Sequence, residues 1–335
     1  MSKTMERSDP GLATLSEVLD PIALVTHLRG VGLGLPNGEV VKEVDLRVLR
    51  HVPGRRCTLE IHARADSGWH VLIGKVYRKD HSDVFGAMQQ IQRARFGPDD
   101  QYSIPEPFAY LPSLLLLLQE RAEGQIAKEL FRAGDDARRA EAAERSARWL
   151  ARFHALAPRT GPVSPPADYL GTKRMQQCAP EIARRDGSLA RKVERLHELL
   201  EDAASSLVPV DLCAGHGAFR PDHVILGRDR TVVFDFDTHD VADPARDVAR
   251  FLVALRRSAL ELGSIRALDE PYRIFLETYL AAGQSGVERN LCFFEAAAYL
   301  KRAKRILSRE AADGRESAEA MLDEGLRALE REVAQ

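Results

Sequence analysis

The sequence predicts an α+β protein in which an antiparallel sheet comes first and a larger helical part follows. Three strand-like segments lie between residues 44 and 79, and the turn residues Pro53-Gly54 and Asp66-Ser67-Gly68 separate them. Beyond about residue 125, apolar residues recur at helical spacing instead, as in AEAAERSARWLARFHAL. This change of period predicts a small sheet-containing lobe followed by a mostly helical lobe.

The elements are expected in a definite order. Strands at 44–52, 56–65 and 69–79 precede a helix at about 82–96. The leucine run 111–118 is short and flanked by prolines, which favours a buried strand. Five later segments have helical periodicity, at 191–203, 246–262, 270–283, 293–307 and 316–333.

A polar segment at 213–240 interrupts these helices. Within it, VIL and TVVFDFD read as two short strands joined by the turn Gly227-Arg228-Asp229-Arg230. A polar loop that feeds a hairpin inside a helical lobe is a plausible frame for an active site. We therefore expect a lobe over 1–118, a hinge at 119–124 and a helical lobe over 125–335 that carries this loop.

Composition limits the possible partners and location. The 335 residues carry a formal net charge of -2, so no global basic field favours nucleic acid or an anionic membrane. The four cysteines lie far apart without a C-x-x-C pair, which favours reduced thiols over a zinc site or a disulfide framework. The N-terminus has no apolar signal segment, and the leucine run is too short to span a bilayer. We expect a cytoplasmic protein with a small-molecule partner.

Three polar motifs follow one another in the helical lobe. The segment from His216 to His223 reads HGAFRPDH, Asp235-Phe236-Asp237 comes about a dozen residues later, and DPARD ends at Asp247. This order resembles the signature of aminoglycoside phosphotransferases, choline kinases and their relatives. The resemblance implies a bilobal protein kinase-like fold and transfer of a phosphoryl group from ATP or GTP to a small-molecule hydroxyl. It also implies that lobe 1–118 binds the nucleotide and that lobe 125–335 carries the acceptor cleft.

The resemblance also implies a magnesium site. Asp235 falls on the metal-binding aspartate of the family motif, and Asp237 is a second candidate ligand. Phosphoryl transfer depends on aligning the acceptor and on neutralising phosphate charge. One or two carboxylates together with the nucleotide's phosphates are a sufficient magnesium site.

The loop departs from the family pattern at two positions. Ala218 stands where the motif has the aspartate that serves as the base, and His223 stands at the place of the loop asparagine, a metal ligand. An imidazole suits softer metals better than magnesium. Arg220 occupies a position where related loops carry a cation, so it either contacts the γ-phosphate or braces the loop through Asp222. Asp222 is a further candidate for the base.

The resemblance assigns nucleotide contacts to the first lobe. Lys75 matches the strand lysine that binds the α- and β-phosphates, although the helix after it offers no glutamate to pair with that lysine. Arg55 and Arg56 lie in the turn that corresponds to the phosphate-covering loop. The segment Gln119-Glu120-Arg121 corresponds to the hinge, whose backbone meets the adenine edge.

Two functions therefore remain open. The first is an ATP- or GTP-dependent, magnesium-requiring phosphotransferase with an altered loop. The second is a catalytically impaired pseudokinase that binds a nucleotide and acts as a regulatory or partner-binding protein, as the methyl group of Ala218 suggests. Since this fold handles several acceptors, the sequence does not select one.

Overall fold

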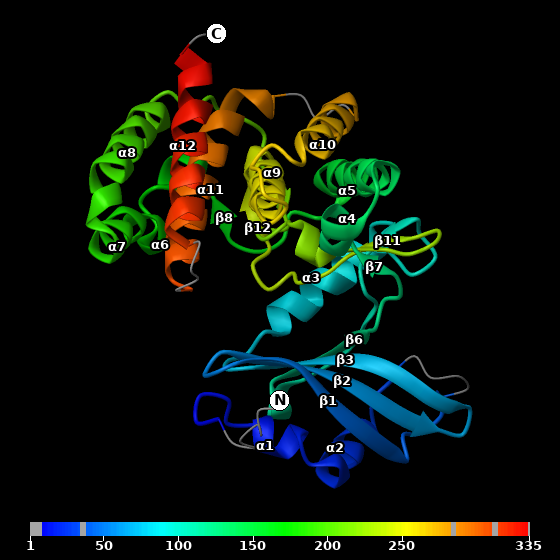
Figure 1. Cartoon of the computed structure of the whole chain (residues 1–335). Helices are drawn as coiled ribbons and strands as arrows, with labels where there is room; N and C mark the ends of the chain where they lie inside the picture. Colours follow the sequence, from blue (N-terminus) through cyan, green and yellow to red (C-terminus); the bar gives the residue numbers. More distant parts are fainter. Residues whose placement is uncertain (1–8, 34–37, 283–285, 310–313, 334–335) are drawn as a thin grey trace. The chain divides into compact units, whose positions relative to one another are not determined.

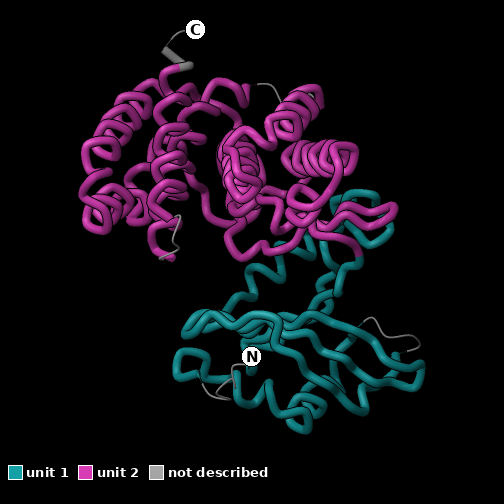
Figure 2. Tube along the Cα trace, in the orientation of Figure 1, with its two compact units in different colours: residues 1–123 teal, residues 124–335 magenta. Residues whose placement is uncertain are grey.

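The computed structural model describes residues 9–33, 38–282, 286–309 and 314–333. The chain divides into two compact units, Met1–Glu123 and Gly124–Gln335 (Figure 2). The first unit is built on an antiparallel sheet and the second is mainly helical, so the predicted α+β class is confirmed. No helix in the described part of the chain has the length and apolar character needed to cross a membrane.

The first unit contains a five-stranded sheet in the order β1-β2-β3-β6-β5 (Figure 1). Every neighbouring pair is antiparallel. The strands are β1 (Glu43–Val52), β2 (Arg56–Ala65), β3 (Gly68–Tyr77), β5 (Pro107–Leu111) and β6 (Leu116–Glu120). Helix α3 (Ser82–Arg93) and the short β4 (Tyr102–Ser103) connect β3 to β5. The three expected strands and the helix after them are therefore present.

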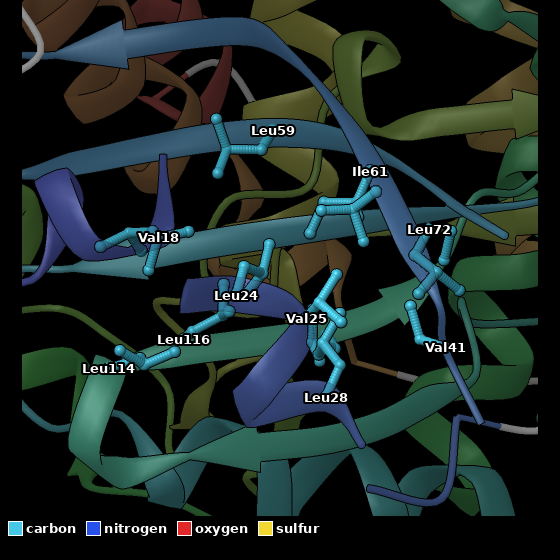
Figure 3. Packing of buried hydrophobic residues seen from close by; sticks show 14 of the residues in the cluster. Val18, Leu24, Val25, Leu28, Val41, Leu59, Ile61, Leu72, Leu114 and Leu116 are labelled. Atoms are coloured by element: carbon cyan, nitrogen blue, oxygen red, sulfur yellow. The ribbon is translucent and has the colours of Figure 1, made fainter. Parts of the chain in front are cut away.

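Two helices that the sequence did not predict precede the sheet. They are α1 (Leu15–Val18) and α2 (Pro21–Leu28), and the Asp20 side chain caps α2 by accepting hydrogen bonds from the first helical amides. Apolar side chains from α2, including Leu24, pack with Ile61 and Leu72 of the sheet in one buried cluster (Figure 3). The helices thus cover one face of the sheet.

The leucine run differs from its prediction. Pro112 starts the 3-10 turn η2 (Pro112–Leu114), and Leu115 has a left-handed φ of 48°. Only the last three leucines belong to β6. The chain reverses here because β5 and β6 pair antiparallel, so half of the run forms the turn between them.

The second unit is mainly helical. Its principal helices are α4 (Ala127–Ala133), α5 (Asp136–Leu156), α7 (Cys178–Arg185), α8 (Ala190–Ala204), α9 (Ala245–Leu260), α10 (Asp269–Ala281), α11 (Glu288–Leu307) and α12 (Gly314–Val333). Shorter turns are η3 (Pro166–Asp168), α6 (Lys173–Gln176) and η4 (Gly187–Leu189). Trp149 and Phe153 of α5 stack with ring centroids 4.9 Å apart, and Trp149 also stacks on Phe219 at 5.8 Å. Of the face that helical spacing predicts on α5, Trp149, Leu150 and Phe153 are buried, whereas Leu156 at the end of the helix is 48% exposed.

Short strands frame the loop 216–223. Strands β10 (Val224–Leu226) and β11 (Thr231–Val233) form an antiparallel hairpin, and β7 (Gln125–Ile126) pairs with β10. Before the loop, β9 (Cys213–Gly215) pairs with β12 (Asp240–Ala242), which also pairs with β8 (Val163–Ser164). The loop itself contains the 3-10 turn η5 (Pro221–His223). Strand β11 ends at Val233, so Asp235 lies in the irregular segment after it and not in the expected strand.

Candidate active site

The loop 216–223 is anchored by a buried carboxylate. Asp247, in the first turn of α9, accepts hydrogen bonds at Oδ2 from the backbone amides of His216 (2.7 Å) and Gly217 (3.2 Å). Burial favours the protonated acid, but interactions with His154, Arg246 and Arg250 outweigh it and hold the pKa of Asp247 well below its usual value. An ionised carboxylate thus fixes the start of the loop.

Gly217 is required by the backbone of this loop. Its φ is +75°, a region that L-residues rarely adopt. An added Cβ would lie 1.8 Å from the carbonyl oxygen of Thr238. The loop and the segment after Asp237 therefore approach each other more closely than any side chain would allow.

His216 connects the loop to the segment that carries Asp235. Its Nε2 lies 3.1 Å from the carbonyl oxygen of Phe234, and its Nδ1 accepts a hydrogen bond from the amide of Ala218 at 3.2 Å. These partners require a neutral ring protonated at Nε2. Burial also lowers the pKa of His216, consistent with the neutral ring. His216 thereby holds Phe234 and the following aspartate against the loop.

The structure brings together Arg220, His223 and Asp235. Arg220 Nη2 donates to His223 Nε2 over 2.7 Å, and Asp235 Oδ2 lies 3.4 Å from the same nitrogen. Because a guanidinium only donates, His223 must carry its proton on Nδ1. That Nδ1 is buried without a hydrogen-bond partner among the described residues. Burial, followed by the charge of Arg220, lowers the pKa of His223 to about 3, so the ring is neutral.

Asp235 adopts an uncommon backbone conformation. Its φ is 76°, in the left-handed region that aspartate tolerates better than most residues. Such conformations cluster at functional sites, where the surrounding structure maintains them. The turn after β11 directs the chain so that the carboxylate lies beside His223.

Asp222 lies between Arg220 and His223 in the loop, but its carboxylate is bonded to another element. Its Oδ1 accepts a hydrogen bond of 2.9 Å from Lys128 of α4. Burial raises the pKa of Asp222, but the hydrogen bond and charge of Lys128 outweigh this effect and leave the pKa below its usual value. A carboxylate stabilised in this way is a weak proton acceptor. The structure therefore gives Asp222 a bracing role between the loop and α4.

The motif that ends at Asp247 braces the lobe. Asp243 accepts hydrogen bonds from the amide of Ala245 (2.8 Å) and from the side chain of Asn290 on α11 (2.7 Å). Arg246 donates two hydrogen bonds to Asp240 on β12. Asn290 and Asp240 were not predicted, because partners distant along the chain leave no local pattern.

The carboxylate of Asp235 is the feature that fits magnesium. Magnesium takes one or two protein carboxylates and completes its shell with water and phosphate oxygens. Asp237 follows two residues later, and the Nε2 lone pair of His223 is engaged by Arg220. No group of three histidine, cysteine or acidic side chains that could hold a metal occurs within the described ranges. The residues thus suit a cation that is held together with a nucleotide.

In the first unit, Lys75 is buried on β3, with 5% of its surface exposed. It stands opposite Thr58 on β2 and Leu117 on β6, on the face away from α2. Glu60, two positions along β2, lies diagonally across the same face. Its carboxylate accepts a hydrogen bond of 2.9 Å from Arg121. Glu60 is therefore a buried acid near Lys75 that the sequence analysis missed, since only the helix was searched for one.

The turn that carries Arg55 and Arg56 is fixed by an aspartate from the N-terminal segment. Asp9 Oδ2 accepts a hydrogen bond from the amide of Gly54 and lies 2.8 Å from His51 Nε2. The hydrogen bond from Gly54 is the main cause that lowers the pKa of Asp9. The turn between β1 and β2 is thus anchored at its tip.

The hinge segment begins within the sheet. Gln119 is buried and pairs with Ile73 of β3 and Pro107 of β5. The amide of Glu120 donates to the carbonyl of Glu106 over 2.8 Å. The Glu120 amide is therefore already engaged, and the side chain of Arg121 is held by Glu60.

The first unit is built on a sheet and the second is mainly helical. In the second unit, the anchored loop that begins with His216-Gly217 is followed by Asp235. Together these features are typical of kinase-like phosphotransferases. The model of the phosphotransferase enzyme family matches residues 72–289, which is more than half of the chain. The chain therefore belongs to the phosphotransferase enzyme family. A comparison with curated protein sequences gives no match.

Solved structures have the same fold. A choline kinase from Cryptosporidium parvum is 12% identical, with a TM-score of 0.60 over 93% of this chain and 96% of that chain. A thermostable mutant of aminoglycoside phosphotransferase APH(4)-Ia, in a ternary complex with ADP and hygromycin B, is 17% identical, with a TM-score of 0.58 over 85% and 94%. The streptomycin–ATP–APH(2")-IIa ternary complex is 16% identical, with a TM-score of 0.53 over 84% and 93%. At these identities the likeness establishes the protein kinase-like fold alone.

Proposed function

We propose that the protein transfers the γ-phosphoryl group of ATP or GTP to a hydroxyl group of a small molecule. Asp235 would hold magnesium against the nucleotide's phosphates, with Asp237 as the second candidate ligand. The bound cation would neutralise part of the phosphate charge. Lys75 would bind the α- and β-phosphates, and Arg220 would stabilise charge on the transferred group.

The observation that carries the proposal is the anchoring of the loop. The buried Asp247 carboxylate holds two loop amides, and His216 ties the loop to Phe234. These contacts position Arg220 and Asp235 at one place, where each has a charge suited to phosphoryl transfer. A protein that kept this fold without binding a phosphate group would not need the charges of Arg220 and Asp235 to be held together.

A second candidate function is nucleotide binding without turnover. The methyl group of Ala218 can neither accept a proton nor orient a hydroxyl. A positioned base contributes about 10²- to 10⁴-fold in rate. Because the transition state of phosphoryl transfer is loose and needs little early deprotonation, we propose that slow transfer persists.

The metal assignment is tested with Asp235→Asn. Titration of the purified chain with ATP and with GTP, with and without magnesium, should show nucleotide binding that magnesium strengthens. Asp235→Asn should weaken the magnesium-dependent part by about tenfold or more, because a neutral amide is a poor ligand for this hard cation. Asp229→Asn, an exposed acid on the adjacent hairpin turn, is the matched control and should bind as the native chain does.

Turnover is tested with Ala218→Asp. Restoring a carboxylate should raise the rate of transfer or nucleotide hydrolysis by about 10²-fold. A native chain that binds nucleotide but turns over only after this substitution would establish the second candidate. Absence of nucleotide binding by the native chain would refute both candidates.

A further inference from the structure

Tyr279 of α10 and His154 of α5 form a buried hydrogen-bonded pair. The Tyr279 hydroxyl lies 2.7 Å from His154 Nδ1, and the two rings meet edge to face with centroids 5.7 Å apart. Helices α5 and α10 pack against each other within the second unit, and only 0% of Tyr279 and 6% of His154 are exposed. Because burial excludes water, each of these polar groups depends on a partner within the protein.

The other ring nitrogen of His154 faces the carboxylate that anchors the loop 216–223. His154 Nε2 lies 3.8 Å from Asp247 Oδ2, a distance longer than a hydrogen bond, and both side chains are almost completely buried. The same oxygen accepts hydrogen bonds from the amides of His216 and Gly217. In such a dry environment the dipole of the imidazole acts strongly on this oxygen. His154 is thus placed between Tyr279 and the anchor of the loop.

The Tyr279 hydroxyl determines which nitrogen of His154 carries the proton. A neutral imidazole has one N–H donor and one lone pair. Burial is the main cause that raises the pKa of Tyr279, so the phenol keeps its proton and can donate a hydrogen bond to Nδ1. The proton of His154 then stands on Nε2 and faces the negative charge of Asp247. In the other tautomer the Nε2 lone pair would face that carboxylate and repel it.

We propose that Tyr279 is a positioning residue for the loop 216–223, because its hydroxyl holds His154 in the tautomer that keeps Asp247 in place. Without the hydroxyl, the two tautomers compete, and one of them repels the carboxylate that binds the loop amides. Tyr279 acts through His154 and touches neither the nucleotide nor the acceptor. Its effect on nucleotide binding rests on the proposed phosphotransfer, whereas its effect on His154 and on the loop does not.

The tautomer of His154 can be measured directly in the full chain. Long-range proton–nitrogen NMR spectra of a chain labelled with ¹⁵N-histidine distinguish the two neutral tautomers and the imidazolium, and loss of the signal in His154→Gln assigns it. The native His154 should be a neutral ring protonated on Nε2 at neutral pH. Tyr279→Phe removes the hydroxyl alone and should change the ratio of the tautomers by about fivefold or more, the contribution of one hydrogen bond.

Tyr272→Phe is the matched control, because it also removes a hydroxyl hydrogen bond from α10. The Tyr272 hydroxyl donates to Glu295 of α11, and its ring centroid lies 4.3 Å from the guanidinium of Arg256. Both phenylalanine variants should lower the midpoint temperature of unfolding by similar amounts. Tyr272→Phe should leave the tautomer of His154 unchanged, which separates a general loss of stability from the effect of Tyr279.

Hydrogen exchange of the two anchored amides follows the loop itself. In Tyr279→Phe, the amides of His216 and Gly217 should exchange about fivefold faster than in Tyr272→Phe. Magnesium-dependent nucleotide binding should weaken by a similar factor. In a His154→Gln background, Tyr279→Phe should add no further change, because a glutamine amide has no tautomer to fix.

The outcomes separate this proposal from the function. A native His154 protonated on Nδ1 or on both nitrogens, a tautomer ratio that Tyr279→Phe leaves unchanged, or equal exchange rates in the two phenylalanine variants would each refute the positioning role and leave phosphotransfer untouched. Changes in the tautomer and in loop exchange, in a chain that binds no nucleotide, would uphold the positioning role and refute the phosphotransferase. Should His154→Gln fail to fold, the proximity of His154 to the Tyr279 ring assigns its signal, and the two phenylalanine variants still decide.

Discussion

At the scale of single residues, His223 shows how one substitution changes the chemistry of a loop. An asparagine at this position would offer an amide oxygen to a cation. The imidazole instead accepts a hydrogen bond from Arg220 and lies 3.4 Å from Asp235. Arg220 thus acts through a neutral ring beside the proposed metal ligand, and protonation of that ring would place a second cation against Arg220.

His223 should make stability depend on pH. The folded pKa of about 3 is lower than the ordinary value of 6.5, so the unfolded chain binds the proton more readily between these values. His223→Gln should therefore flatten the loss of unfolding free energy as the pH falls from about 6.5 towards 3. The limiting slope is about 1.4 kcal/mol per pH unit. Urea unfolding at a series of pH values gives the unfolding free energy at each pH and therefore this slope.

The control is His197→Gln on α8, where the native side chain is 38% exposed. This variant should keep the native dependence on pH. The same slope in the native chain and in His223→Gln would contradict a neutral, buried His223.

At the scale of elements, the loop 216–223 is defined more by its close approaches than by its polar residues. Gly217 has a left-handed backbone next to the Thr238 carbonyl, and Asp247 holds the amides of His216 and of Gly217 itself. The family pattern H-G therefore corresponds to a backbone requirement, because no side chain fits at the second position.

Gly217→Ala should destabilise the chain by about 2 kcal/mol or more, because strain and the contact with Thr238 act together. It should also weaken magnesium-dependent nucleotide binding, since the loop cannot keep its anchored shape. Gly187→Ala is the matched control, because an added Cβ there meets nothing within 4 Å. Chemical denaturation that gave equal stabilities for the two variants would show that the loop tolerates a side chain.

At the scale of the whole molecule, each unit has its own buried core. Leu24 of α2 is fully buried against the sheet of the first unit, whereas Ile22 on the same helix is 82% exposed. Leu24→Ala should cost about 2–5 kcal/mol, and Ile22→Ala should change stability by less than about 0.5 kcal/mol.

Hydrogen exchange followed by mass spectrometry shows which unit Leu24→Ala destabilises. In Leu24→Ala, amides of β2 and β3 should exchange faster, while those of α9 and α11 should keep their native rates, because units with separate cores open separately. Faster exchange in α9 and α11 would show instead that the chain unfolds as one cooperative unit.

Much of the fold was predictable because it depends on local patterns. The strands β1 to β3 and the helices α5 and α8 to α12 follow from alternation, turn residues and helical periodicity, whereas α4, α6 and α7 were not predicted. The predictions of secondary structure fail where tertiary packing or a turn, and not the local pattern, determines the backbone conformation. Pro112 and Leu115 turn half of the leucine run into a reversal, and α1 and α2 were missed although Asp20 and Pro21 mark a helix start.

The site was predictable in part. The ordered motifs predicted the importance of Arg220, His223 and Asp235, which the structure brings together. Glu60 and Lys128 were not predicted as partners of Arg121 and Asp222. Contacts between residues that lie 61 and 94 positions apart in the sequence depend on how the strands and helices pack, and spacing along the chain does not encode them.

The sequence by itself determined the α+β class, the order of the two units and the absence of a carboxylate at position 218, because composition and periodicity are properties of the chain. Only the tertiary structure decided that Asp247 anchors the loop, that Arg220 is bonded to His223, and that Lys128 pairs with Asp222. Charge pairing and desolvation depend on distances in three dimensions, and those distances exist only after the helices have packed.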